Sequence, residues 1–99
     1  MQTPSIYALF MIPTSQTSDV KLSKIYPKNK RFFTFAEAED LLDGFPEVRK
    51  SIKLGHILLI DDDGANRKKR KRNRSARYYD LNHKLIYGKA ILVKEDWIK

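Results

Sequence analysis

The densest charge in the chain lies at residues 67–74, the basic run, where seven of eight residues are Lys or Arg. Asn73 is the one interruption. Like charges at this density repel one another and resist burial, so we expect a flexible loop over residues 65–75 that protrudes until an anionic partner neutralises it. The Lys and Arg side chains of the run can contact phosphates, and such contacts give affinity for nucleic acid without recognition of a base sequence.

Two tyrosines follow this run in the sequence, and a basic turn at residues 28–31 precedes it. Tyr78 and Tyr79 could stack on the bases of a single strand. We expect a strand here, whose side chains alternate, so that one of the two tyrosines points outward. The basic turn at residues 28–31 would extend the positive surface if it lies on the same side of the fold as the run. The predicted binding residues are therefore Arg67, Lys68, Lys69, Arg70, Lys71, Arg72, Arg74, Tyr78, Tyr79, Lys28, Lys30 and Arg31.

The basic run also has a second interpretation. Residues 68–71 match the loose pattern of a nuclear-localisation signal, and a basic peptide can dock on an acidic protein or on anionic lipid head groups. The sequence thus predicts a small nucleic-acid-binding or accessory protein that contacts DNA or RNA without sequence specificity. The alternative is a viral or phage-type protein-interaction module, and a solvated loop without a partner is the third reading. We expect a cytoplasmic protein, or a nuclear one if the host is a eukaryote.

A carboxylate cluster precedes the run at Asp61, Asp62 and Asp63. Clustered carboxylates hold Mg²⁺ in nucleases. An EF-hand loop starting at Asp61 would need Gly and Glu at its sixth and twelfth positions, where this chain has Asn66 and Arg72. We therefore interpret the cluster as the acidic residues of a turn at a strand end.

Other catalytic chemistry finds little support in the sequence. The chain has no Cys, and its two histidines are interpreted as a structural residue, His56, and a solvated turn residue, His83. It has no glycine-rich phosphate loop and no nucleophile motif. We predict no catalytic residue, no metal, no cofactor and no enzymatic activity.

The composition confines the basicity to this one segment. The 99 residues include 20 Lys and Arg against 12 Asp and Glu, for a net charge of +8. Without the seven cations of the run, 13 basic residues remain against 12 acidic ones, so the body is almost neutral. The length predicts a single domain over residues 1–99. The apolar runs are too short for a transmembrane helix, and the start lacks the basic region of a secretory signal.

Several elements must position these residues. The apolar run at 6–12 is typical of a buried strand, and a short strand is expected at 24–26 after a flexible loop over 13–23. Thr34 and Glu37 match a capping box. We predict a helix over residues 35–43, with Gly44 supplying its left-handed end.

The second half predicts mostly strands. Residues 45–53 fit either a helix or a strand that pairs with 56–60 as a hairpin. After the basic run, strands are expected at 77–81 and 84–87 around a turn, and another at 90–93 behind a bulge or kink at Gly88. Trp97 and Ile98 are expected to clip the C-terminus to the core. The predicted class is α+β, with one main helix packed on a mostly antiparallel sheet of about five or six strands and a protruding basic loop.

Several short motifs follow one another in a definite order between residues 24 and 93. They are Ile25, Tyr26 and Pro27; Phe33, Thr34 and Phe35; Gly44; residues 58–64; Asn73, Arg74, Ser75 and Ala76; and residues 86–90. Their order resembles a family of short, functionally uncharacterised proteins found in phages, viruses and mobile elements. The resemblance favours the hairpin over residues 47–60 and implies no reaction. That family has a short, mostly uncharged loop before the Asn, so the basic run resembles an addition to its scaffold.

Overall fold

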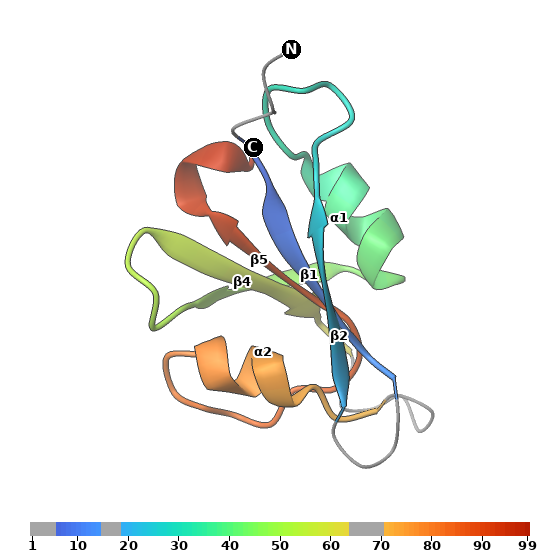
Figure 1. The fold of residues 1–99 in the computed structure, drawn as a ribbon, viewed down its shortest axis with the longest axis vertical. Coiled ribbons are helices and arrows are strands. Elements are labelled where there is room, and N and C mark those ends of the chain that lie inside the picture. The colour runs from blue at the N-terminus through green and yellow to red at the C-terminus, as the bar shows by residue number, and fades with distance from the viewer. Residues whose placement is uncertain (1–5, 15–18, 64–70) are drawn as a thin grey trace.

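The computed structural model describes residues 6–14, 19–63 and 71–99 (Figure 1). Its elements follow one another as β1 (Ala8–Pro13), β2 (Val20–Ile25), α1 (Phe35–Leu42), β3 (Pro46–Lys50), β4 (His56–Asp61), α2 (Arg74–Tyr79), β5 (Ala90–Lys94) and a 3₁₀-helix (Glu95–Trp97). The strands form one sheet in the order β2-β1-β5-β4-β3, and each neighbouring pair is antiparallel. The predicted α+β class, with one main helix on an antiparallel sheet, is confirmed.

The two helices cover opposite faces of the sheet. Successive strand side chains point to opposite faces, and each face builds its own core. On one face Ala38 and Leu42 of α1 pack with Phe10, Leu59 and Ile91. On the other, Ala76 of α2 packs in the cluster that contains Met11, Leu58, Ile60, Ile86, Ala90 and Leu92. The three central strands are therefore apolar on both sides, which explains their continuous apolar runs.

The predicted capping box at the start of α1 is confirmed. The Thr34 hydroxyl accepts a hydrogen bond from the Glu37 amide at 3.1 Å, and the Glu37 carboxylate accepts one from the Thr34 amide at 3.5 Å. The predicted end is wrong by one residue, because Asp43, with φ 57°, adopts the left-handed conformation. Gly44 has a different role: a Cβ atom there would collide with the carboxylate of Asp61. Packing against β4, rather than the end of α1, accounts for this glycine.

The second strand is longer than predicted. It starts at Val20, within the predicted loop over 13–23, and pairs with β1 from Ala8 to Pro13. Because β2 is an edge strand, its exposed positions carry polar residues such as Lys21 and Lys24. That composition concealed a strand in the sequence. The middle of the predicted loop, residues 15–18, lies outside the described residues.

The hairpin over residues 46–61 resolves the open choice at residues 45–53. Antiparallel β3 pairs with β4, and Val48 lies opposite Leu59. The predicted attachment of the C-terminus is also present, since the Phe33 amide donates to the Trp97 carbonyl at 2.7 Å and Ile98 is buried. The chain end is thereby joined to the segment that leads into α1.

The prediction of two strands after the basic run is wrong. Residues 74–79 form the short helix α2, and of residues 84–87 only Tyr87 makes a β-bridge, to Arg72. The Asn73 side chain accepts a hydrogen bond from the Ala76 amide at 3.0 Å, which caps the helix start. Aromatic residues favour strands in general, and here the local cap and the burial of Ala76 override that preference.

Candidate nucleic-acid interface

The end of the basic run is fixed to the body of the protein. The Lys71 carbonyl accepts a hydrogen bond from the Gly88 amide at 2.7 Å, and the Asn73 amide donates to the Ile86 carbonyl at 2.7 Å. Residues 71–75 are therefore not the loop that the sequence predicts: residues 71–73 pair with residues 86–88, and residues 74 and 75 begin α2. The remaining cations of the run, Arg67, Lys68, Lys69 and Arg70, lie outside the described residues.

Asn73, which interrupts the run, is the residue that ties it to the sheet. Its side chain is buried, and its Nδ2 donates to the Met11 carbonyl at 3.1 Å and to the Gly88 carbonyl at 2.8 Å. Its Oδ1 accepts from Ala76, as described above. One side chain thus joins β1, the segment before β5 and the start of α2. A Lys or Arg at position 73 would bury its charge, and because neither side chain has an acceptor, the Ala76 amide would lose its hydrogen bond.

Three arginines line one hollow of about 250 Å³, together with Asn73, Leu85 and Ile86. They are Arg72, Arg74 and Arg77, and we call this site the arginine hollow. The Nε of Arg77 donates to the His83 carbonyl at 2.9 Å, which holds that side chain against the loop after α2. Guanidinium groups present several N–H donors in a plane and can bind phosphate oxygens in pairs. The hollow can therefore receive an anion at the end of the basic run.

Arg77 was absent from the predicted binding residues. It lies three residues after Arg74. This spacing places two side chains on the same face of a helix, but on opposite faces of a strand. The helix was not expected, so the pairing was missed. His83, predicted to be a solvated turn residue, is exposed as expected and has φ 51°.

The two tyrosines have different surroundings. Tyr78 is 62% exposed, whereas Tyr79 is partly buried against the cluster on the α2 face. Their rings meet edge to face, with centroids 5.1 Å apart. One tyrosine is thus accessible, as the sequence suggested. The reason is that successive residues of a helix point in different directions around its axis, and not that side chains alternate along a strand.

The turn that contains Lys28, Lys30 and Arg31 belongs to another part of the surface. All three side chains are exposed, and the turn is held by Asn29, whose Oδ1 accepts hydrogen bonds from the Arg31 and Phe32 amides. The turn lies at the top of the molecule in Figure 1, and α2 lies at the bottom. This turn does not extend the positive surface around α2.

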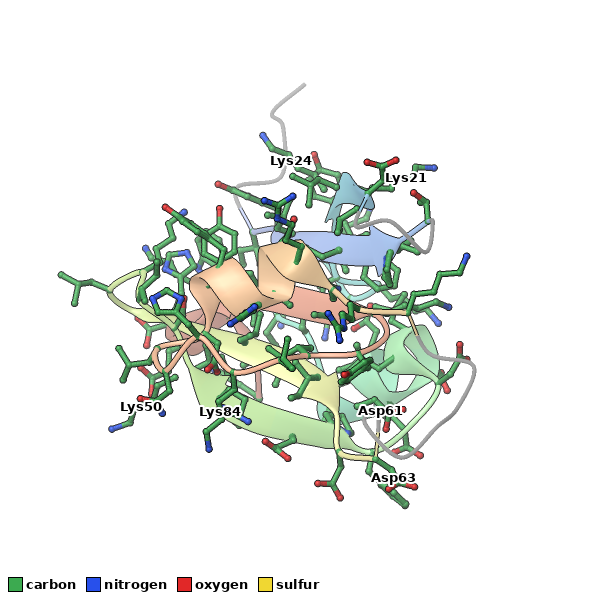
Figure 2. The ribbon with its side chains drawn as sticks, turned by 90° about the horizontal axis from the view of Figure 1, so that it is seen from below. Lys21, Lys24, Lys50, Asp61, Asp63 and Lys84 are labelled. Carbon is green, nitrogen blue, oxygen red and sulfur yellow. The ribbon has the colours of Figure 1, made fainter. Side chains whose placement is uncertain are left out.

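Asp61 and Asp63 form a turn at the end of β4. The buried Asp61 accepts a hydrogen bond from the Asp63 amide at 3.1 Å, and the Asp62 amide donates to the Phe45 carbonyl at 2.9 Å. Figure 2 shows Asp61 and Asp63 at one corner of the molecule, away from Lys50 and Lys84. Within residues 6–14, 19–63 and 71–99, no three His, Asp or Glu side chains gather as metal ligands.

A buried ion pair, which the sequence did not indicate, holds the far end of α2. Asp80 is 1% exposed, and its carboxylate lies 3.1 Å from a terminal nitrogen of Arg49 on β3. It also accepts hydrogen bonds from the amides of Asn82 and Lys84. The Leu81 amide donates to the Lys50 carbonyl, so the loop after α2 is joined to the edge of the sheet. Together, Asn73 and Asp80 fix α2 at both ends.

None of the helices in the described part of the chain has the length and apolarity needed to cross a membrane. Comparison of the chain with protein-family models, with curated proteins and with solved structures finds no match. The resemblance to short phage and viral proteins therefore stays a prediction.

Proposed function

We propose that this protein binds nucleic acid without sequence specificity, through a protruding basic loop at residues 67–70 and the adjoining arginine hollow. The observation that carries the proposal is the convergence of Arg72 and Arg74, at the end of the run, with Arg77 on one hollow. A fixed arginine loses less conformational freedom on binding phosphate than one on an unrestrained segment, so it contributes more affinity per contact.

The distribution of charge supports the same function. The seven cations of the run account for most of the net charge of +8, and Arg77 adds another cation at the hollow. Such a patch attracts a polyanion over several ångströms, and its affinity arises from release of the counterions around phosphate. The protein would act in the cytoplasm, or in the nucleus of a eukaryotic host.

The first test is fluorescence anisotropy with labelled duplex DNA, single-stranded DNA and RNA at several salt concentrations. The variant R74Q/R77Q removes two cations from the hollow. If each contacts one phosphate, the log–log salt slope on duplex DNA should become shallower by about two. The affinity should fall on all three ligands, because phosphate contacts do not read base sequence.

The matched control is K28Q/R31Q, which also removes two exposed cations, but from the turn at the opposite end of the molecule (Figure 1). Its slope and affinity should stay near those of the wild type. Equal losses in both variants would mean that net charge alone drives binding, and the hollow would have no special part in it. If the wild type fails to bind at physiological salt, the proposal falls, and the nuclear-localisation or acidic-protein docking alternative becomes the one to pursue by pull-down.

A further inference from the structure

A second cavity, of about 390 Å³, opens on the sheet face that carries α2. Leu9 of β1 and Leu92 of β5 lie on this face, and the aromatic rings of Tyr7, Tyr79 and Trp97 line the cavity beside them. We call this site the aromatic cleft. Its aromatic residues come from the residue before β1, the end of α2 and the C-terminal 3₁₀-helix, so no local sequence pattern could have indicated it.

The rim of the aromatic cleft is basic. Lys24, Lys53 and Lys94 line it and are exposed, and His56 lies beside them. The described residues that line it include no carboxylate. Figure 2 shows Lys24 at the β2 edge of this face, with Lys50 and Lys84 at the opposite edge. An apolar, aromatic interior with a cationic rim suits a flat ligand that carries negative charge.

Two of these lysines, Lys24 and Lys94, lie over aromatic rings of the cleft. The Nζ of Lys24 is 5.0 Å from the centre of the Tyr7 ring, and the Nζ of Lys94 is 5.0 Å from that of Trp97. The two rings are themselves 5.7 Å apart and tilted by 54°. Such cation–π contacts at an exposed site are weak, so an arriving phosphate can draw the ammonium groups away. The same movement uncovers the ring faces for a planar group.

We propose that the aromatic cleft binds a nucleotide, with the base stacked on Tyr7 or Trp97 and the phosphate bound by Lys24 and Lys94. Base stacking on aromatic side chains tolerates all bases, because every base has a π-face. The nucleotide can be free or part of a single strand. In duplex DNA the bases are stacked on one another, so a duplex cannot fill the cleft without losing a base from its stack.

The helix α2 connects the cleft to the arginine hollow. Arg74 begins α2 and lines the hollow, and Tyr79 ends it and lines the cleft. Its six residues rise by about 9 Å. A strand of a few nucleotides can span this length, with phosphates in the hollow and a base in the cleft. For a strand, as opposed to a free nucleotide, the inference rests on the proposed function.

Tryptophan fluorescence tests the cleft directly, because Trp97 is the single tryptophan of the chain. We would titrate the protein with a mononucleotide, with a short single-stranded oligonucleotide, and with the same oligonucleotide as a blunt duplex. Ribose 5-phosphate serves as a ligand that has the phosphate but no base. We expect quenching by the mononucleotide or the single strand, and little quenching by the duplex or the sugar phosphate.

The variant Y7A removes one stacking surface, and K24Q removes one cation from the rim. The Kd for the quenching ligand should rise by about 5- to 150-fold in Y7A, from the cost of losing one stacked base. Y26A is the matched control, because Tyr26 is also an exposed tyrosine near the end of β2 but does not line the cleft. Thermal melting of all variants identifies any loss of folding.

The outcomes separate this inference from the proposed function. Quenching by the mononucleotide that survives R74Q/R77Q but not Y7A supports the cleft as a nucleotide site, whatever the fate of strand binding. Quenching by the single strand alone, lost in both variants, supports a strand that occupies both sites. If strands bind by anisotropy while Trp97 fluorescence stays unchanged and Y7A binds like the wild type, the cleft inference is overturned and the proposed function stands. Absence of binding in both assays overturns both.

Discussion

At the level of single residues, the buried polar side chains explain how a strongly basic segment is attached to a folded domain. Asn73 and Asp80 are each 1% exposed, and every hydrogen-bonding group that they bury meets a backbone or side-chain partner. Among the described residues, no buried side-chain nitrogen or oxygen lacks a partner. Removing one of these side chains takes a hydrogen-bond partner away from each group that it contacts, and where such a group is buried the loss costs more than the bond itself contributed.

Replacement of Asn73 by alanine should therefore destabilise the protein. It removes the cap of α2, worth about 1 kcal/mol, and leaves the Met11 and Gly88 carbonyls without this donor, which adds about 1–3 kcal/mol. Urea denaturation should show a loss of roughly 2–4 kcal/mol in the free energy of unfolding. N29A is the control, since Asn29 also bonds two backbone groups but is exposed, and it should cost less than about 1 kcal/mol. Equal effects in both variants would contradict the structural role of Asn73.

At the level of elements, α2 is the part that depends most on its neighbours. A six-residue helix is too short to be stable alone, so its persistence relies on Asn73 at one end, Asp80 at the other and Ala76 beneath. The end of α2 is connected to β3 and the residues after it by the Arg49–Asp80 ion pair and by backbone hydrogen bonds from Ile52 to Tyr79 and from Leu81 to Lys50. Because α2 bears residues of both proposed sites, its attachment should also control binding.

Replacement of Arg49 by methionine keeps an unbranched apolar side chain but removes the guanidinium, which leaves Asp80 as a buried charge without its cation. Breaking such a pair costs about 3–5 kcal/mol; here two amides still donate to the carboxylate, so we expect roughly 2–3 kcal/mol. The control K89M breaks the exposed ion pair of Lys89 with Asp43 and should cost less than about 1 kcal/mol. Chemical denaturation of both variants measures the difference. A loss in R49M no larger than in K89M would show that the pair does not hold α2.

At the level of the whole molecule, the net charge is concentrated in a segment that contributes little to the hydrophobic cores. The residues outside the basic run are almost neutral in sum, and the two cores on either side of the sheet are built from apolar side chains. Self-repulsion within a concentrated patch opposes the compact state, and salt reduces this repulsion.

The variant R67Q/K68Q/K69Q/R70Q lowers the net charge from +8 to +4. We expect a free energy of unfolding equal to or up to about 0.5 kcal/mol above that of the wild type at low salt, because surface changes of this kind have small effects. The difference should shrink at high salt. Thermal melting at two ionic strengths measures it. A destabilisation beyond about 1 kcal/mol would mean that these cations take part in the fold.

The features that could be predicted from the sequence are those that depend on neighbours in the chain. The capping box joins Thr34 to Glu37 three residues away, and the buried strands follow from continuous apolar runs. The concentration of positive charge is likewise a property of composition. These features need no knowledge of the global topology, because the interacting groups are adjacent along the chain. At residues 45–53 the sequence left helix and strand open, and only the pairing with β4 decided for the strand.

The features that could not be predicted depend on segments distant in sequence. Asn73 reaches Met11, 62 positions away, and Arg49 reaches Asp80, 31 positions away. The aromatic cleft joins Tyr7 to Trp97, and the opposite placement of the 28–31 turn and α2 follows from the route of the chain around the sheet. The residue types along the chain do not indicate which of these distant residues come into contact. The packing of two helices on opposite faces of one sheet brings them together, and it is this packing that places cations and aromatic rings on a common surface.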